Sequence, residues 1–277
     1  MTYSEALRKS TEYLKEADDK DAATDASLLL MHVTGKDRTF FLAHGDEELT
    51  EREETLYQLL TEKRGGHVPL QHLTGTMNFM GLDFNVSENV LIPRIDTEFL
   101  VEEAMTFVED GARVLDVCTG SGCILLSLMR YKNDIEGVGV DISDDALALS
   151  EKNAEELEVQ NVRFIKSDLF ENVEGKFDYI LSNPPYIRTS DIDGLMEEVR
   201  LHEPHLALDG GEDGLDFYRR IAHEAKDYLE SEGRLFFEIG FDEGDALRQI
   251  LTEEGYKDIE VVKDYSGNER VVRCLKG

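Results

Sequence analysis

A loop of unusual composition lies in the second half of the chain, directly after a short apolar run. It reads Asn183-Pro184-Pro185-Tyr186. Because Pro185 restricts the residue before it to extended backbone, we expect the Pro184 carbonyl oxygen to have a fixed direction. With the amide oxygen of Asn183, it can accept both hydrogens of an incoming –NH2 group, and the Tyr186 ring can stack on the planar group that carries it. Such acceptors orient a delocalised nitrogen and stabilise the positive charge that develops on it as it attacks an electrophile. We therefore predict a catalytic loop that needs neither a metal nor a nucleophilic side chain.

A glycine-containing turn lies earlier, between an apolar run that ends at Val117 and an apparent helix. It reads Cys118-Thr119-Gly120-Ser121-Gly122. Glycines let the backbone turn sharply and approach a ligand closely, so a nucleotide cofactor is the natural expectation. The spacing differs from the dinucleotide fingerprint GxGxxG, and no GK[ST] sequence follows. The turn is therefore predicted to hold a nucleoside rather than a row of phosphates.

Acidic residues follow the next two apolar runs. Asp141 comes about 20 residues after the turn, where a carboxylate can accept both ribose hydroxyls of an adenosine. Asp168, in the sequence Ser167-Asp168-Leu169, can accept a hydrogen bond from an adenine amino group. An aspartate at a strand end is often only a cap, but together with the turn these residues favour a cofactor site. S-adenosylmethionine fits better than a dinucleotide, because it has no pyrophosphate that requires a helix N-terminus.

The elements that must position these residues begin with a helical region. Up to residue 66, apolar residues recur at helical spacing, and Thr50 with Glu53 has the spacing of a capping box. We predict one helix that contains Leu7 and Leu14, a second over Ala22–Val33, a short third at 40–42, and a fourth after Thr50. Residues 67–92 are predicted to form a β-hairpin linker, with strands at Leu70–Thr74 and Met80–Val86.

Residues 93–277 have a different pattern, in which strands and helices alternate after a first helix at about 96–108. Strands are predicted at Ala112–Val117, Gly137–Val140, Val162–Ile165, Tyr179–Leu181, Arg234–Ile239, Ile259–Val262 and Arg270–Leu275. Repeated βα units imply a parallel sheet that is covered on both faces. The last two strands suggest an antiparallel hairpin at one edge. The fold class is therefore α/β, with a Rossmann-like sheet of seven strands.

The composition limits the partners. The chain has 29 Lys+Arg and 60 Asp+Glu, a formal net charge of −31. Docking on DNA or RNA normally needs a basic face, so direct nucleic-acid binding is not expected. No apolar run reaches the roughly 18 residues of a membrane span. The cysteines, Cys118, Cys123 and Cys274, lack metal-site spacing and fit a reducing cytoplasm.

The chain as a whole resembles the HemK/PrmC family, the peptide chain release factor glutamine N5-methyltransferases. These belong to the class I S-adenosylmethionine-dependent methyltransferases that act on planar amino groups. Besides the turn and the Asn-Pro-Pro-Tyr loop, the distinctive segments are Gly75–Phe84, Leu91–Arg94, Ser182–Ile187, Glu203-Pro204 with Ala207-Leu208, Gly210–Leu215 and Glu238–Gly240.

The resemblance implies a helical substrate-recognition domain over residues 1–66, the hairpin linker and a methyltransferase domain over residues 93–277. The substrate would be the glutamine of the Gly-Gly-Gln motif in bacterial class I release factors. Residues 118–122 would line the cofactor, Asp141 would bind its ribose, and Asp168 and Leu169 would flank its adenine. Residues 183–186 would hold the substrate amide, with Asn183 also near the cofactor.

The sequence departs from the family pattern at three places. Cys118 stands where glycine is frequent, and we expect an ordinary backbone conformation there. The sequence Ile95-Asp96-Thr97 replaces a frequent Pro-Glu-Thr, and Leu169 stands where some relatives have an aromatic residue.

Two other functions remain open at this stage. The same loop would suit an N6-adenine methyltransferase acting on DNA or RNA, with the target base flipped out. A binding module without activity is the other, although an intact turn and loop argue against it. We expect a cytoplasmic protein, and a monomer by default.

Overall fold

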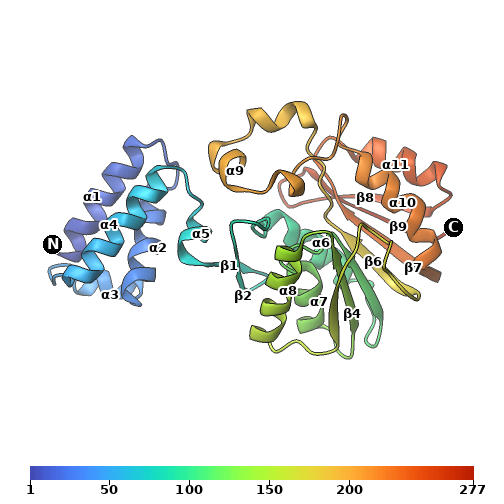
Figure 1. The fold of residues 1–277 in the computed structure, drawn as a ribbon, viewed down its shortest axis with the longest axis horizontal. Helices are drawn as coiled ribbons and strands as arrows, with labels where there is room; N and C mark the ends of the chain where they lie inside the picture. The colour runs from blue at the N-terminus through green and yellow to red at the C-terminus, as the bar shows by residue number, and fades with distance from the viewer. The chain divides into compact units, whose positions relative to one another are not determined.

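The computed structural model describes residues 1–277 and divides into two compact units, which are drawn in Figure 1. The first unit contains Met1–Thr76 and Met196–His202, and the second contains Met77–Leu195 and Glu203–Gly277. The chain thus leaves the second unit after Leu195 and returns to it at Glu203. No helix is both long enough and apolar enough to cross a bilayer.

The first unit is helical. Its helices are α1 (Tyr3–Glu16), α2 (Ala22–Thr34), α3 (Arg38–Ala43), α4 (Glu51–Gly65), α5 (Leu70–Thr74) and α9 (Glu197–His202). The four helices predicted within residues 1–66 are all present. The capping box of α4 is also present: the Thr50 hydroxyl accepts from the backbone N–H of Glu53, and the Glu53 carboxylate accepts from the backbone N–H of Thr50 at 2.8 Å. Leu29, Leu30 and Tyr57 are fully buried in the core of this unit.

The predicted strand at Leu70–Thr74 is wrong, because these residues form helix α5. Pro69 precedes the helix and Gly75 ends it in the left-handed conformation, with φ +81°. Five residues are too few to separate helical from strand periodicity, so the flanking residues decide. The hairpin exists further on, between β1 (Thr76–Phe79) and β2 (Leu82–Asn85).

The second unit is built on a seven-stranded sheet with the order β5-β4-β3-β6-β7-β9-β8. The strands are β3 (Arg113–Val117), β4 (Glu136–Asp141), β5 (Val162–Lys166), β6 (Phe177–Ser182), β7 (Leu229–Glu238), β8 (Lys257–Lys263) and β9 (Glu269–Leu275). The first five in that order are parallel, and β9 is antiparallel to both of its neighbours. The predicted fold class and the edge hairpin are therefore confirmed.

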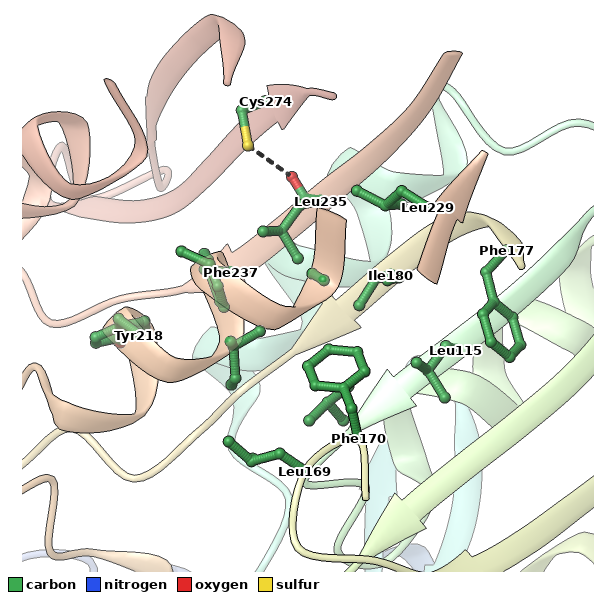
Figure 2. Packing of buried hydrophobic residues seen from close by; sticks show 14 of the residues in the cluster. Leu115, Leu169, Phe170, Phe177, Ile180, Tyr218, Leu229, Leu235, Phe237 and Cys274 are labelled. Carbon is green, nitrogen blue, oxygen red and sulfur yellow. Dashed lines mark hydrogen bonds between the residues drawn. The ribbon is translucent and has the colours of Figure 1, made fainter. Parts of the chain in front are cut away.

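Helices cover both faces of the sheet. On one face lie α10 (Asp216–Tyr228) and α11 (Gly244–Glu253), and on the other lie α6 (Ile95–Met105), α7 (Cys123–Tyr131) and α8 (Asp144–Glu156). Strand side chains alternate between the two cores: Leu115 packs on the first face and Val114 on the second. Figure 2 shows part of the first core, where the Cys274 thiol lies 3.9 Å from the Leu235 carbonyl oxygen.

Between the Asn-Pro-Pro-Tyr loop and α10 the chain forms short elements that the sequence did not reveal. They are the 3-10 helix η1 (Thr189–Gly194), helix α9 and the 3-10 helix η2 (His205–Ala207). Each is at most six residues long. Periodicity is not measurable over so few residues.

The sheet core offers a matched test of packing. Phe237 is fully buried on β7, whereas Phe241, four positions later, is 69% exposed. We expect Phe237→Ala to lower the free energy of unfolding by about 3–5 kcal/mol, since it removes buried apolar surface and leaves a cavity. Phe241→Ala should change it by less than about 0.5 kcal/mol. Urea denaturation followed by circular dichroism measures both, and equal effects would contradict this description of the core.

Candidate active site

A cavity of about 220 Å³ lies in the second unit, at the carboxyl ends of parallel strands. Its wall includes residues 118–121 after β3, residues 141–143 after β4, residues 167–169 after β5, and Asn183 and Pro185 after β6. Open α/β sheets bind ligands at this edge, because the loops after neighbouring strands converge there. The structure thus brings most of the site residues that the sequence predicted together in the wall of one cavity.

Three predicted residues do not line this cavity: Gly122, Pro184 and Tyr186. Gly122 begins α7 with φ +78°, and a Cβ atom there would come within 3.0 Å of Leu126 Cδ1. The left-handed backbone conformation and the close packing therefore both require glycine at position 122. Pro184 is buried, and the Tyr186 side chain packs partly buried against the sheet core.

The backbone conformation of Cys118 differs from the prediction. Its φ is +62°, in the left-handed region, so it does not have the ordinary backbone conformation predicted for a non-glycine residue. A left-handed conformation costs such a residue about 1–2 kcal/mol. The next residue stabilises the turn, because the backbone N–H of Thr119 donates to the Val140 carbonyl oxygen at 3.0 Å.

Asp141 is held by the turn that it faces. Oδ2 accepts from the backbone N–H of Gly120 at 2.9 Å, and Oδ1 accepts from the backbone N–H of Ser143 at 3.0 Å. Burial raises the pKa of Asp141, and these N–H groups partly oppose the rise. Each carboxylate oxygen can accept a further hydrogen bond. The oriented carboxylate can therefore receive two neighbouring hydroxyls.

Asp168 and Leu169 form another part of the wall. Asp168 is paired with Arg220 of α10, with Oδ1 2.8 Å from Nη2, and both residues line the cavity. Leu169 is only 4% exposed and has φ +51°. Ile142 and Phe217 add apolar surface to the same wall. A flat heterocycle can be held between such side chains, with Asp168 or Arg220 at its polar rim.

The nitrogen end of the Asn183 side-chain amide already forms a hydrogen bond within the protein. Its Nδ2 donates to Thr97 Oγ1 at 3.3 Å. No N–H or hydroxyl of the protein donates to Asn183 Oδ1 or to the Pro184 carbonyl oxygen. Neither oxygen is engaged by a donor of the protein, and two such acceptors on adjacent residues are what holding an –NH2 group requires, although Pro184 itself is buried outside the cavity wall.

The Tyr186 side chain forms a hydrogen bond with a buried glutamate. Its hydroxyl donates to Glu238 Oε1 at 3.4 Å, and burial raises the pKa of Tyr186 well above its usual range. Glu238 itself is 1% exposed, and burial raises its pKa to about 7. The phenol therefore stays protonated and serves as a donor.

Sequence reasoning assigned no site role to several residues of the wall: Val90, Thr97, Ile142, Phe217 and Arg220. Only Thr97 lies in a segment that the sequence had singled out, Ile95–Thr97, and it was given no role there. Phe217 and Arg220 come from a helix about 50 positions after Asp168, in a layer that covers the sheet. Arg94, at the start of α6, and Glu203 form an ion pair that joins two further segments of this wall. Only the fold brings these positions to the cavity.

The residues present fit S-adenosylmethionine. Asp141 offers two acceptor positions, the left-handed turn at 118–120 leaves backbone close to the hollow, and apolar side chains line the opposite part. No cluster of lysine or arginine surrounds the turn, which agrees with a ligand without phosphate. Fold and site together define a class I methyltransferase that uses S-adenosylmethionine.

Comparisons with known proteins identify the family. Residues 5–75 match the family model "PrmC N-terminal domain" and residues 94–208 match "Methyltransferase small domain". The release factor glutamine methyltransferase of Clostridium acetobutylicum is 42% identical, covering 100% of this chain and 99% of its own. That of Escherichia coli is 40% identical, covering 98% of each. The chain belongs to the release factor glutamine methyltransferases.

The fold has neighbours among solved structures. A methyltransferase from Pyrococcus furiosus superposes with a TM-score of 0.55 at 21% identity, covering 71% of this chain and 90% of that one. This likeness concerns the fold alone.

Asp141 offers a test of the cofactor site. We expect Asp141→Ala to weaken S-adenosylmethionine binding by about 10- to 100-fold, since a hydrogen bond to a charged group contributes about 1.5–3 kcal/mol. Titration calorimetry measures the Kd directly. The control is Asp145→Ala, which removes an exposed carboxylate from the first turn of α8. If both variants bind the cofactor equally well, Asp141 does not have the proposed role.

Proposed function

We propose that the chain transfers a methyl group from S-adenosylmethionine to the side-chain amide nitrogen of the glutamine in the Gly-Gly-Gln motif of bacterial class I release factors. The observation that carries the proposal is the pair of free acceptors, Asn183 Oδ1 and the Pro184 carbonyl oxygen, beside a cavity suited to that cofactor. Relatives that are 42% and 40% identical over nearly their full length are named for this activity.

In the proposed mechanism, the residues of the cavity wall hold the cofactor. When bound, S-adenosylmethionine supplies an electrophilic methyl group on its sulfonium sulfur. In this proposal, residues 118–122 lie along its methionine part, Asp141 accepts the ribose hydroxyls, and Asp168 with Leu169 flanks the adenine. Asn183 stands between the cofactor and the substrate.

In the proposed mechanism, the loop at residues 183–186 makes the amide nitrogen of the substrate reactive. The nitrogen of a glutamine amide is a poor nucleophile, because its lone pair is delocalised into the carbonyl group. Asn183 Oδ1 and the Pro184 carbonyl oxygen accept its two hydrogens, orient the nitrogen and stabilise the positive charge that develops on it. Tyr186 supports the planar amide, and the surplus proton passes to water afterwards. No general base is required.

The first unit is proposed to recognise the release factor, in agreement with the residues 5–75 that match the family's N-terminal domain. We further propose a cytoplasmic monomer that does not bind nucleic acid directly. The net charge of −31 supports docking to a basic protein surface and disfavours a polyanion. Charge-assisted docking should weaken as salt rises.

The function is tested with labelled cofactor and purified substrates. We expect the protein to methylate a wild-type class I release factor and to leave unlabelled a release factor whose motif glutamine is changed to alanine. Mass spectrometry should find one added methyl group on that glutamine. An adenine-containing duplex oligonucleotide serves as the comparison substrate. Labelling of the oligonucleotide instead of the release factor would support the N6-adenine methyltransferase alternative.

A substitution at Asn183 tests whether this residue acts in the chemical step rather than in cofactor binding. We expect Asn183→Ala to lower kcat for release factor methylation by about 100-fold or more, the scale of a lost transition-state hydrogen bond. Binding of S-adenosylmethionine should stay close to that of the wild type, because Asp141 and the turn are untouched. Single-turnover kinetics and calorimetry measure the two properties. Unchanged turnover would remove Asn183 from the mechanism.

A further inference from the structure

A second glycine-rich segment, at residues 208–214, has no role in the site described so far. The sequence had singled out most of it, as Gly210–Leu215, without giving it a task. None of its residues lies in the wall of the cavity, although the segment belongs to the same compact unit as the Asn-Pro-Pro-Tyr loop. Any effect that it has on the reaction must therefore pass through a neighbour.

That neighbour is the backbone that leaves the Asn-Pro-Pro-Tyr loop. The Ile187 N–H donates to the Leu208 carbonyl oxygen at 3.0 Å, and the Gly210 N–H donates back to the Ile187 carbonyl oxygen at 2.8 Å. The Thr189 N–H then donates to the Gly211 carbonyl oxygen at 2.9 Å. Residues 208–214 thus pair with the chain directly after the loop, in the manner of a short parallel strand.

The two ends of the loop are therefore fixed by different parts of the unit. Before the loop, the buried Ser182 hydroxyl donates to the Val117 carbonyl oxygen of β3 at 2.7 Å. After it, Asp209 Oδ1 accepts from the Thr189 hydroxyl at 2.6 Å and from the Gly211 N–H at 3.0 Å. The sheet fixes the first end and the 208–214 segment fixes the second.

Two glycines let the segment lie directly against the loop. A Cβ atom at Gly210 would lie 2.7 Å from Tyr186 Cα and 2.8 Å from the Pro185 carbonyl oxygen, and one at Gly214 would lie 2.5 Å from the Tyr186 carbonyl oxygen. These separations are well inside van der Waals contact, and the atoms met are backbone atoms, which cannot turn aside as a side chain can. Gly210 does not have a positive φ, so the close approach alone requires glycine there.

We infer that Gly210 and Gly214 are positioning residues, which act through the loop by fixing the place of its backbone at Pro185 and Tyr186. The backbone at these positions carries the two acceptors before it, Asn183 Oδ1 and the Pro184 carbonyl oxygen. A side chain on the segment would push the loop away and move both acceptors. The inference rests on the proposed role of the loop in holding the substrate amide.

Gly214→Ala is compared with a glycine variant of equal backbone strain. Gly214 and Gly111 have nearly the same φ, +82° and +81°, but nothing lies within 4 Å of a Cβ atom at Gly111. We expect Gly214→Ala to lower kcat for release factor methylation by about 10- to 100-fold, the cost of misplacing reacting groups by about 1 Å. Gly111→Ala should keep the kcat of the wild type. Equal kcat values in the two variants overturn the inference.

Binding of S-adenosylmethionine separates this positioning role from general damage to the site. The Kd measured by calorimetry should stay close to that of the wild type in Gly214→Ala, because Asp141 and the turn at residues 118–122 are not in contact with the segment. A variant that loses cofactor affinity in proportion to its loss of kcat overturns the inference.

Hydrogen exchange measures the displacement of the loop without any activity assay. Gly210→Ala is the second variant, since the three atoms nearest to its Cβ are all backbone atoms. Amides within residues 183–190 should exchange faster in Gly210→Ala and Gly214→Ala than in the wild type or in Gly111→Ala. Unchanged exchange in both variants overturns the inference.

Asp209 provides a variant that adds no atom, which keeps the test valid if an alanine at either glycine prevents folding. Asp209→Ala removes the acceptor for two hydrogen bonds and should lower kcat with little change in cofactor Kd. Asp209→Asn keeps the Oδ1 acceptor and should restore most of the rate. An Asp209→Ala variant with the kcat of the wild type overturns the inference. The proposed function fails separately, when the wild-type protein leaves the release factor unmethylated or Asn183→Ala has the kcat of the wild type.

Discussion

The parallel pairing of β3 with β4 and with β6 is the constraint on which the site depends. Val117 lies opposite Val140 in one pair and opposite Ser182 in the other. The glycine turn, Asp141 and the Asn-Pro-Pro-Tyr loop therefore leave the sheet side by side, although they are far apart in the chain. Parallel strands need helical crossovers, and these cover both faces and keep the edge rigid. The register of these three strands thus brings the cavity wall and the Asn-Pro-Pro-Tyr loop to one edge of the sheet.

Two buried carboxylates lie beneath this edge. Asp116, on β3, is fully buried and accepts from the Thr119 hydroxyl at 2.6 Å, while Glu238 is the last residue of β7 and is 1% exposed. Burial raises the pKa of each to about 7, because the charged form loses its hydration. Such groups are costly in a core, and they are tolerated where they fix the direction of neighbouring polar groups. Asp116 does this for Thr119 in the glycine turn, and Glu238 does it for Tyr186 in the Asn-Pro-Pro-Tyr loop.

Residues 196–202, which follow the Asn-Pro-Pro-Tyr loop in the chain, are anchored within the first unit. Arg64 of α4 is nearly buried; its Nε lies 2.6 Å from Asp25 Oδ2, and its Nη1 lies 2.8 Å from Glu198 Oε2. Glu198 belongs to α9, so this ion-pair cluster holds residues 196–202 in the helical unit. Burial also raises the pKa of Asp25 to about 6. The proposed recognition unit thus includes a piece of the chain that lies between the Asn-Pro-Pro-Tyr loop and the cavity wall at Pro204.

The sequence by itself determined the elements with clear local signals: the capped helices of the first unit, the seven strands, and the loops that carry Gly120, Asp141 and Asn183. These depend on periodicity, caps and motifs, all of which are local properties. It did not determine the helix at Leu70–Thr74 or the left-handed Cys118, since both depend on neighbours outside the segment. The tertiary structure alone decided that Thr97 meets Asn183, that Glu238 meets Tyr186 and that Arg220 pairs with Asp168. Contacts between distant residues follow from strand register and helix packing, which no local pattern encodes.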